Sequence, residues 1–419
     1  MEVLRCSSHS FTSRGNCMKY VELFSAVESG AAIRRVRRLQ PVGGPGDKLF
    51  PPTYPNDKGK PPRHVTEDRR IGGSTVPCVL CDSAASQANR MEEALEAALR
   101  SGRLQLPSIA VDFSGTDAAD IGTISALEAP HRVYDAILRD SRLGDVLFRD
   151  SEIGRSLVLA TTRDASALYR YAPTSLVFGA WNSTGGGGGL GAKFPRSVVS
   201  EIVGVNVQMG SRVGSRMDPL GIRAGIAIAK DVDGSWRLLD ANTKTAKKEK
   251  IVKPSEINHG NIAPTVDENL GVTVDYALQT WVLSLASLRR LRFVPSSDDA
   301  EISARAVLAA VALVALVELD TSGYALRSRC DFVPDIEAPA GQRGELQLVN
   351  ADGSSTTVSL DRAGAYALLG DATAAAAAHG LPWHPETIRL EPDARLVELV
   401  LRSRALALAG KGEDDDTGE

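Results

Sequence analysis

The strongest chemical signal in this sequence lies in residues 176–222, where a glycine run is flanked by positive charge. An apolar stretch, expected to be a short strand, ends at Trp181, and five consecutive glycines begin at Gly185. Four cations follow the glycines: Lys193, Arg196, Arg212 and Arg216. Glycines let a backbone approach a ligand closely and expose its N–H groups, and cations attract phosphate. The segment therefore predicts a basic loop that binds a polyanion.

The spacing excludes a nucleotide-binding P-loop. That pattern requires Lys directly after its last glycine, followed by Ser or Thr. Here Gly191 is followed by Ala192, Lys193 and Phe194. The glycine run is therefore interpreted as a loop without a bound nucleotide.

Two further segments extend this pattern, Val76–Glu93 (VPCVLCDSAASQANRMEE) and Leu127–Gly154 (LEAPHRVYDAILRDSRLGDVLFRDSEIG). With the glycine segment (FGAWNST, GAKFPR, SRMDPLGI) and fainter matches at Phe50–Tyr54 and Leu326–Asp331, they resemble a known family. It is the backbone-subunit family of CRISPR type I effector complexes, in the branch of subtype I-G (formerly I-U), a Cas-seven-like member of the RAMP superfamily. The resemblance runs from about residue 20 to about residue 333, and the last part of the chain resembles no family.

The resemblance implies an α+β fold built on an RNA-recognition-motif-like (ferredoxin-like) antiparallel sheet, with large insertions that act as fingers and a thumb. It implies a non-catalytic protein. Since the sequence shows no signal peptide and no apolar run of membrane length, we expect a cytoplasmic protein, and we expect no cofactor. Several copies would line up along a CRISPR RNA beside other effector subunits and present the guide for pairing with target DNA. The aromatic signature of ordinary RNA-recognition motifs is absent. We therefore expect contacts with the RNA backbone rather than base stacking on the sheet.

The residues predicted to contact RNA come from the three matching segments and from both glycine turns. They are Gln87, Asn89, Arg90, His131, Arg132, Trp181, Ser183, Gly186, Gly187, Lys193, Arg196, Arg212 and Arg216. The alternative for the last four is structural ion pairing, with Glu201 and Asp218 as the nearest acids. For Gln87, Asn89 and Arg90 the alternative is helix capping and solvation.

A metal-dependent ribonuclease that cuts RNA in the same groove is the second functional hypothesis. His131 and Asp135 could form its acid/base pair, but Asp135 and Arg139 have the spacing of a helical ion pair. Asp117 and Asp120 lie in a Gly/Ser/Asp-rich loop and are interpreted as solvated. Cys78 and Cys81 have no second pair at zinc spacing, so we expect buried thiols and no metal site.

Charge is distributed unevenly along the 419 residues, whose formal net charge is −4. Residues 335–419 carry 7 Lys/Arg against 15 Asp/Glu, whereas residues 1–334 carry 41 against 37. A basic body with an acidic end fits a polyanion binder, with affinity confined to grooves. The longest uncharged apolar run, Ala306–Val317, is shorter than the ~20 residues of a membrane helix, so we expect no membrane contact.

Three divisions of the chain are predicted. Residues 1–17 are a disordered tail or precede the true start at Met18, residues 18–334 form the RNA-binding core, and residues 335–419 form an acidic C-terminal extension. Within the core, residues 43–75 are expected to form a mobile loop, most exposed at Gly43–Arg63 because of its Pro, Gly and Lys content.

The elements that must position these residues follow from periodicity and capping. Strands are expected at Ile33–Val42, Val76–Cys81 and Tyr324–Val333, and strands with turns from Ser156 to Ile228. Helices are expected at Ser83–Arg100 with Asp82 as N-cap, from the Ser125/Glu128 capping box to Gly144, and at Leu278–Leu291, Ala304–Leu319, Ala372–Ala378 and Ala394–Leu408. A lysine-rich loop at Ala241–Lys253 and a hairpin at Asp352-Gly353 complete the expectation.

Overall fold

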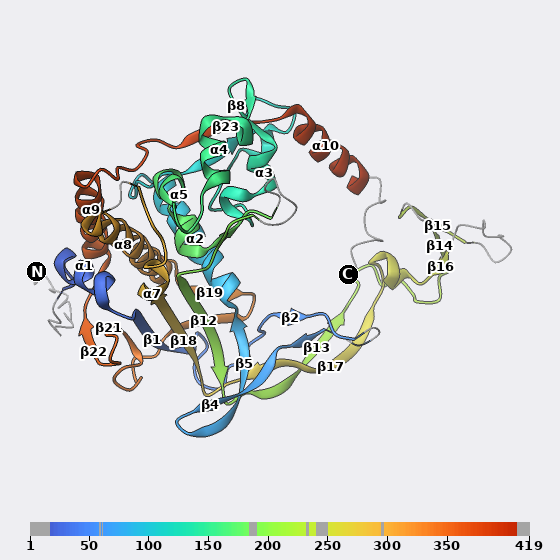
Figure 1. Ribbon diagram of the computed structural model, residues 1–419. Helices are drawn as coiled ribbons and strands as arrows, with labels where there is room; N and C mark the ends of the chain where they lie inside the picture. The colour runs from blue at the N-terminus through green and yellow to red at the C-terminus, as the bar shows by residue number, and fades with distance from the viewer. Residues whose placement is uncertain are drawn as a thin grey trace, which may run out of the picture.

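The fold is α+β and is organised around one large antiparallel sheet (Figure 1). The computed structural model describes residues 17–57, 60, 62–183, 191–231, 234–239, 250–294 and 297–408. The sheet has the strand order β19-β20-β1-β18-β12-β5-β4, with β21 and β22 added beside β1. Its strands are β1 (Ala32–Pro41), β4 (Thr66–Ile71), β5 (Ser74–Asp82), β12 (Val198–Val205), β18 (Tyr276–Ser284), β19 (Tyr324–Arg327), β20 (Cys330–Pro334), β21 (Arg343–Val349) and β22 (Ser355–Val358).

Helices cover one face of this sheet because each strand presents alternate apolar residues to that side. In β18 the inward residues are Ala277, Gln279, Trp281 and Leu283, and all four are buried. The covering helices are α1 (Tyr20–Ser29), α2 (Ala84–Arg100), α7 (Leu285–Leu288), α8 (Asp298–Ser322) and α9 (Arg362–Ala378). Helix α8 lies against α1, α2 and α9, so its residues from Ala300 to Leu319 are buried all round.

Helix α8 is the one helix in the described part of the chain that is long and apolar enough to cross a membrane by length and composition. Its most apolar window has a mean hydropathy of 2.1 and is 94% buried inside the protein. A helix that is apolar on every side is either buried in a core or spans a membrane. The neighbouring helices account for this composition in α8.

A second, smaller sheet has the order β7-β6-β23-β8-β9 and draws on distant parts of the chain. Its strands are β6 (Ile109–Asp112), β7 (Thr123–Ser125), β8 (Ser141–Leu143), β9 (Val146–Leu147) and β23 (Ile388–Pro392). Strand β23 pairs in parallel with β6, and Ile388 lies opposite Ile109. Since β21, β22, α9 and β23 all come after Asp335, the described part of the C-terminal extension shares its core with the rest of the protein.

A two-stranded arm extends from the main sheet (Figure 1). It consists of β13 (Gln208–Arg216) and β17 (Ile262–Thr273), and its far end carries the small sheet of β14 (Ile228–Lys230), β15 (Trp236–Leu238) and β16 (Lys250–Val252). The remaining elements are short or peripheral: β2 (Thr53–Tyr54), β3 (Arg63–His64), α3 (Ala136–Arg139), α4 (Glu152–Leu159), α5 (Ser166–Tyr171), α6 (Thr174–Phe178), β10 (Ala180–Trp181), β11 (Lys193–Phe194) and α10 (Ala394–Leu408).

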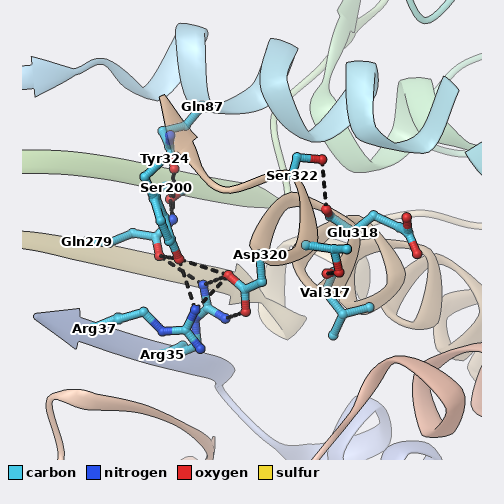
Figure 2. Close-up of polar contacts among 11 residues, drawn as sticks. Arg35, Arg37, Gln87, Ser200, Gln279, Val317, Glu318, Asp320, Ser322 and Tyr324 are labelled. Carbon is cyan, nitrogen blue, oxygen red and sulfur yellow. Dashed lines mark hydrogen bonds and ion pairs between the residues drawn. The ribbon is translucent and has the colours of Figure 1, made fainter. Parts of the chain in front are cut away.

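A buried polar network ties the sheet to the helices above it (Figure 2). The guanidinium of Arg35 donates to both oxygens of Asp320, at 2.5 and 2.9 Å, and to Gln279 Oε1 at 2.9 Å. Gln279 Nε2 donates to Gln87 Oε1 at 3.0 Å, and the hydroxyl of Ser200 donates to the same oxygen at 2.7 Å. These bonds join β1, β12 and β18 to α2 and α8.

The same network continues from Gln87 to the start of α2. Gln87 Nε2 donates to Asp82 Oδ2 at 2.6 Å, and Arg90 Nε donates to that oxygen at 2.9 Å. Arg90 also donates to the carbonyl of Leu326 in β19. The predicted strand and helix around Asp82 are confirmed, but the N-cap is Ser83, whose hydroxyl accepts from Ser86 N at 3.2 Å. Asp82 could not be the cap because its carboxylate is held by Gln87 and Arg90.

Several other sequence predictions are confirmed. Strand β1, helix α8, the β21–β22 hairpin and helix α10 occur where they were expected, and α9 contains the alanine-rich helix. Tyr324–Val333 forms two strands, β19 and β20, instead of one. Cys78, Cys81 and Cys330 are buried free thiols, and a hydrogen bond with the Cys330 thiol, together with burial, raises the pKa of Cys81.

Three secondary-structure predictions are wrong. Residues 276–284 form strand β18, because tertiary packing of their alternating residues overrides helical periodicity. The region after Ser156 begins with helices α4, α5 and α6, and Leu176–Phe178 belongs to α6 instead of a strand. Half of the capping box at Ser125 forms: Glu128 accepts from Ser125 N at 3.0 Å, but the Ser125 hydroxyl accepts from Leu127 N instead of Glu128 N. No long helix follows it, since Arg132 has a φ of +55°, which an α-helix does not allow.

The segment predicted as a mobile loop, residues 43–75, is attached to the fold at several points. Residues 66–71 form strand β4 of the main sheet, and His64 Nε2 accepts from the Gly271 N–H at 3.0 Å. Leu49 is buried, and its backbone N–H donates to the Val272 carbonyl at 2.8 Å at the root of the arm. Phe50 N donates to Arg329 O, between β19 and β20, at 2.8 Å. Residues 58, 59 and 61 of this loop, the lysine-rich residues 241–249, the N-terminal residues 1–16 and the acidic residues 409–419 lie outside the described part.

The network generates a stability prediction for Gln87. Replacing it in Gln87→Met removes both amide contacts and leaves Gln279 and Asp82 short of a buried partner, which should lower the free energy of unfolding by about 1–3 kcal/mol. Urea unfolding followed by circular dichroism measures the effect. Asn89→Ala, on the exposed side of the same helix, is the matched control and should stay within about 0.5 kcal/mol of the wild type. Equal losses in both variants would show that the network does not stabilise the fold.

Candidate polyanion-binding site

The candidate site is a pocket of about 470 Å³ formed where the Pro130–Arg132 turn meets the β10–β11 hairpin. Four of the predicted contact residues with charged or aromatic side chains reach it directly, and Arg132 forms its base. Its lining residues are Pro130, His131, Arg132, Phe178, Gly179, Ala180, Trp181, Lys193, Phe194, Pro195 and Arg196. The fold brings these residues together from two segments of the chain, 130–132 and 178–196.

The hairpin places Trp181 and Lys193 directly opposite each other. Ala180 pairs with Phe194 and Trp181 with Lys193 in an antiparallel ladder. The ammonium of Lys193 lies 4.2 Å from the centre of the Trp181 ring, and 47% of Trp181 is exposed. An ammonium at this distance interacts favourably with the ring. The result is an exposed aromatic surface next to a positive charge.

Gly179 makes the turn that joins α6 to this hairpin. Its φ is +85°, a conformation that residues with a side chain rarely adopt, and a Cβ there would lie 3.0 Å from Arg196 N and Phe194 O. On the other side of Arg196, the Ser197 N–H donates to the Val177 carbonyl at 2.9 Å, which links the end of the hairpin to α6. Arg196 is therefore held at the pocket by backbone contacts on both sides.

Arg132 is buried under the pocket and does not face solvent. Its guanidinium donates to both oxygens of Glu92 on α2, each at 2.6 Å, and to the Gly179 carbonyl at 3.1 Å. Only 8% of Arg132 and 1% of Glu92 are exposed. The interpretation of Arg132 as a free RNA contact is therefore corrected: it braces the turn that carries His131.

Lys193 and Arg196 supply the free positive charge of the pocket. Both side chains are exposed, and neither forms a salt bridge to a carboxylate within the described ranges. Burial lowers the pKa of Arg196, and the neighbouring Arg132 cation lowers it further. His131 is exposed at the rim. Since Arg132 is held below the pocket by Glu92 and the Gly179 carbonyl, the charges of Lys193 and Arg196 are left for a ligand.

The other predicted residues lie elsewhere. Arg212 and Arg216 belong to strand β13 of the arm: Arg212 pairs with Asp267 at 2.8 Å, and Arg216 donates to the carbonyls of His259 and Gly260 at 3.0 Å. Both have structural partners, though not the expected Glu201 and Asp218. Glu201 instead pairs with Arg69 at 2.8 Å, and Asp218 accepts from backbone N–H groups.

The α2 candidates divide into buried and exposed side chains. Gln87 is fully buried in the polar network, so the prediction that it is free for a ligand is wrong. Arg90 is held by Asp82 and two β19 carbonyls, and Asn89 is exposed. Ser183 is exposed, and Gly186 and Gly187 lie outside the described residues.

The acid/base arrangement of the ribonuclease hypothesis does not form. Asp135 accepts from the backbone N–H groups of His131 and Ile137, both at 2.9 Å, and Arg139 pairs with Asp140 instead of Asp135. Asp120 is paired with Arg404 at 2.8 Å. In the described part of the chain, no group of three His, Cys, Asp or Glu side chains could hold a metal ion.

One residue of the site, Glu92, was missed by the sequence analysis. A signal was present, because Glu92 lies four residues after Ala88 and three before Leu95, on the buried stripe of α2. An acid on such a stripe requires a buried cation. The sequence does not show that the cation is forty residues away.

The pocket is basic and partly aromatic, and it lies on an α+β protein. Its chemistry suits a polyanion.

Residues 33–209 match the family model of the CRISPR-associated protein GSU0053. The match covers less than half of the chain but includes β1, α2, the Pro130–Arg132 turn and the whole β10–β11 hairpin. For this part of the chain, the predicted resemblance to a CRISPR-associated family is confirmed.

Two solved structures are similar to the chain at 11% identity. One is a chain of a CRISPR RNA-guided surveillance complex in a pre-nicking state, with 90% of this chain and 99% of that chain covered and a TM-score of 0.30. The other is Csc2 from Thermofilum pendens, with 92% and 80% covered and a TM-score of 0.26. TM-scores this low do not define a common fold. No curated protein matches the sequence.

The Glu92–Arg132 pair generates a pH prediction. Burial raises the pKa of Glu92 from 4.5 to about 7, against the opposing effect of Arg132. The unfolded chain therefore loses this proton at a lower pH than the folded protein. The contribution of Glu92 to stability should be complete below pH 4.5 and should decline as the pH rises through 7, by about 3 kcal/mol at most.

Glu92→Gln cannot titrate and is the matched reference for this prediction. The free energy of unfolding of both proteins is measured by urea unfolding from pH 5 to 8. As the pH rises, that of the wild type should fall relative to that of Glu92→Gln. A constant difference over this range would contradict the raised pKa.

Proposed function

We propose that this protein is a non-catalytic CRISPR RNA-binding backbone subunit of a type I effector complex. Several copies would assemble along the guide RNA and, with other effector subunits, present it for pairing with target DNA. The observation that carries the proposal is the pocket at which Lys193 and Arg196, without carboxylate partners among the described residues, lie beside exposed His131 and Trp181. The family match over residues 33–209 adds the CRISPR context.

The connectivity of the main sheet supports an RNA-recognition-motif-like core. The elements β1, α2, β12, β18, α8 and β20 follow the order β-α-β-β-α-β, the ferredoxin-like pattern. Their strands lie side by side as β20-β1-β18-β12, all antiparallel, with both helices on one face. In this view β4 and β5 extend the sheet, and the arm is an insertion.

The contacts we propose are mainly to phosphate and ribose. Lys193 and Arg196 would neutralise phosphates. Ser183, Gly186 and Gly187 are proposed as contacts with the RNA backbone. Trp181 and His131 offer ring faces, which in RNA-binding proteins stack on unpaired bases. We also propose that exposed Asn89 contacts RNA. Arg212 and Arg216 would contact RNA from the arm, where their structural partners hold their side chains in place.

The arm also exposes large apolar side chains, which isolated surface elements rarely do. Val213, Met217, Leu220 and Val266 are 63–89% exposed. Contact with a neighbouring subunit of the complex would cover them. We propose that the assembled complex is cytoplasmic, since guide and target are found there.

The central test is the removal of the two free cations. Lys193→Ala with Arg196→Ala should abolish co-purification of guide RNA and leave the thermal melt nearly unchanged, since exposed charges contribute at most ~1 kcal/mol each. Arg155→Ala with Arg163→Ala is the matched control, because both cations are exposed and neither lines the pocket. Full RNA retention by the first variant would refute the proposed site.

Salt dependence provides a second test that does not depend on assembly. The slope of log affinity against log salt should be negative, by about 0.7 for each phosphate neutralised on a single strand. Filter binding with RNAs of different sequence should give similar slopes. If each cation contacts one phosphate, the slope of the double variant should be less negative than that of the wild type by about 1.4. An affinity independent of salt would contradict a phosphate-based mode.

A further inference from the structure

A second positively charged pocket lies on the other side of α8 from α2, and no part of the proposed RNA site reaches it. Its volume is about 280 Å³, and it is enclosed by β1, β21, β22 and the last turns of α8. The charged residues in its wall are Arg35, Arg37, Asp320, Arg343 and Glu345. This volume is below the usual range of pockets for drug-sized molecules, so the occupant must be small.

Two guanidinium groups share one carboxylate in this pocket (Figure 2). Asp320 lies 2.5 Å from Arg35 Nη1 and 2.9 Å from Arg37 Nη1. It also accepts from the Tyr324 hydroxyl, which lies 2.9 Å away. Arg35 is 3% exposed. A buried cation normally has an anion of its own, because removing a charge from water is costly.

The remaining charges of the wall do not supply the missing anion. Arg343 and Glu345 are of opposite sign, and a Glu345 carboxylate oxygen accepts from the Arg343 backbone N–H at 3.0 Å. The five charged residues therefore sum to one positive charge. The Nε atoms of Arg35 and Arg37 are buried and have no hydrogen-bond partner among the described residues.

The backbone of β21 bulges opposite Arg37 and lies close against its side chain. The register of β1 with β21 shifts between Arg35 and Arg37, so that β21 has a bulge at this point. Gly344 lies in the bulge with a φ of +94°, and a Cβ there would meet Arg37 Nε at 2.4 Å. Only glycine fits this position without displacing the guanidinium.

We propose that this pocket binds a small oxyanion, a carboxylate or a phosphate group, through Arg37. A guanidinium presents N–H donors in a planar fork that matches either group. The bound anion would balance the excess positive charge beside Arg37, whose Nη1 is already taken up by Asp320 and the Tyr324 hydroxyl. The proposal is independent of the RNA site, with which the pocket shares no lining residue.

The test is a thermal melt of the full chain at constant ionic strength, with chloride replaced stepwise by inorganic phosphate or by acetate. One of these anions should raise the melting temperature in a saturable way, by about 2 °C or more. Arg37→Gln should lose this rise. Arg34→Gln is the matched control, because Arg34 is on the same strand but exposed on the other face, and it should keep the rise. An equal rise in all three proteins, or none in the wild type, overturns the proposal.

A second variant keeps the proposal testable if Arg37→Gln does not fold. Arg37→Lys keeps the positive charge but lacks the planar fork of donors. Without added anion it should melt close to the wild type, and its response to the anion should be clearly smaller. Retention of the full response by Arg37→Lys overturns the proposal.

The two probes also separate the sources of the oxyanion. A response to phosphate but not to acetate assigns the pocket to a phosphate-bearing ligand. A response to acetate assigns it to a carboxylate, such as the acidic side chain of an associated protein. Both results support an oxyanion pocket, whereas a response to neither refutes it.

Discussion

The buried hydrogen-bond network around Gln87, Gln279 and Asp320 is the interaction on which the rest of the structure depends. It crosses three strands of the main sheet and fixes α2 and α8 above them. Polar groups this deeply buried are costly unless each has its partner, so the network tolerates only one arrangement of sheet and helices. The orientation of α2 then decides where Glu92 lies, and Glu92 decides where the Pro130–Arg132 turn can be.

The candidate site thus depends on two successive ionic contacts. Arg132 has a left-handed backbone conformation that costs energy, and its bidentate contact with Glu92 and its bond to Gly179 stabilise that conformation. The contact with Glu92 also holds the Arg132 guanidinium below the pocket, where a ligand does not reach it. Lys193 and Arg196 are left without carboxylate partners in the described part of the chain. A polyanion would meet these two charges on a rigid support, which reduces the entropy lost on binding.

Local sequence signals predicted many of the elements but not their partners. The periodicity of α2, the glycine at the β21–β22 turn and the apolar run of α8 are properties of neighbouring residues, and these elements are confirmed. Strand β18 was predicted as a helix because Leu278–Leu291 is apolar at helical spacing as well. Its strand conformation depends on pairing with β1 and β12, which come from distant parts of the chain.

The sequence by itself determined the chemical character of the site: glycines, cations, one tryptophan and an order of motifs that indicates a CRISPR-associated family. Only the tertiary structure decided which residues are available to a ligand. It buried Gln87 and Arg132 and placed Arg212 and Arg216 on the arm, because each has a partner far away in the sequence. A charged side chain is free only when nothing else neutralises it, and that depends on contacts that spacing along the chain does not encode.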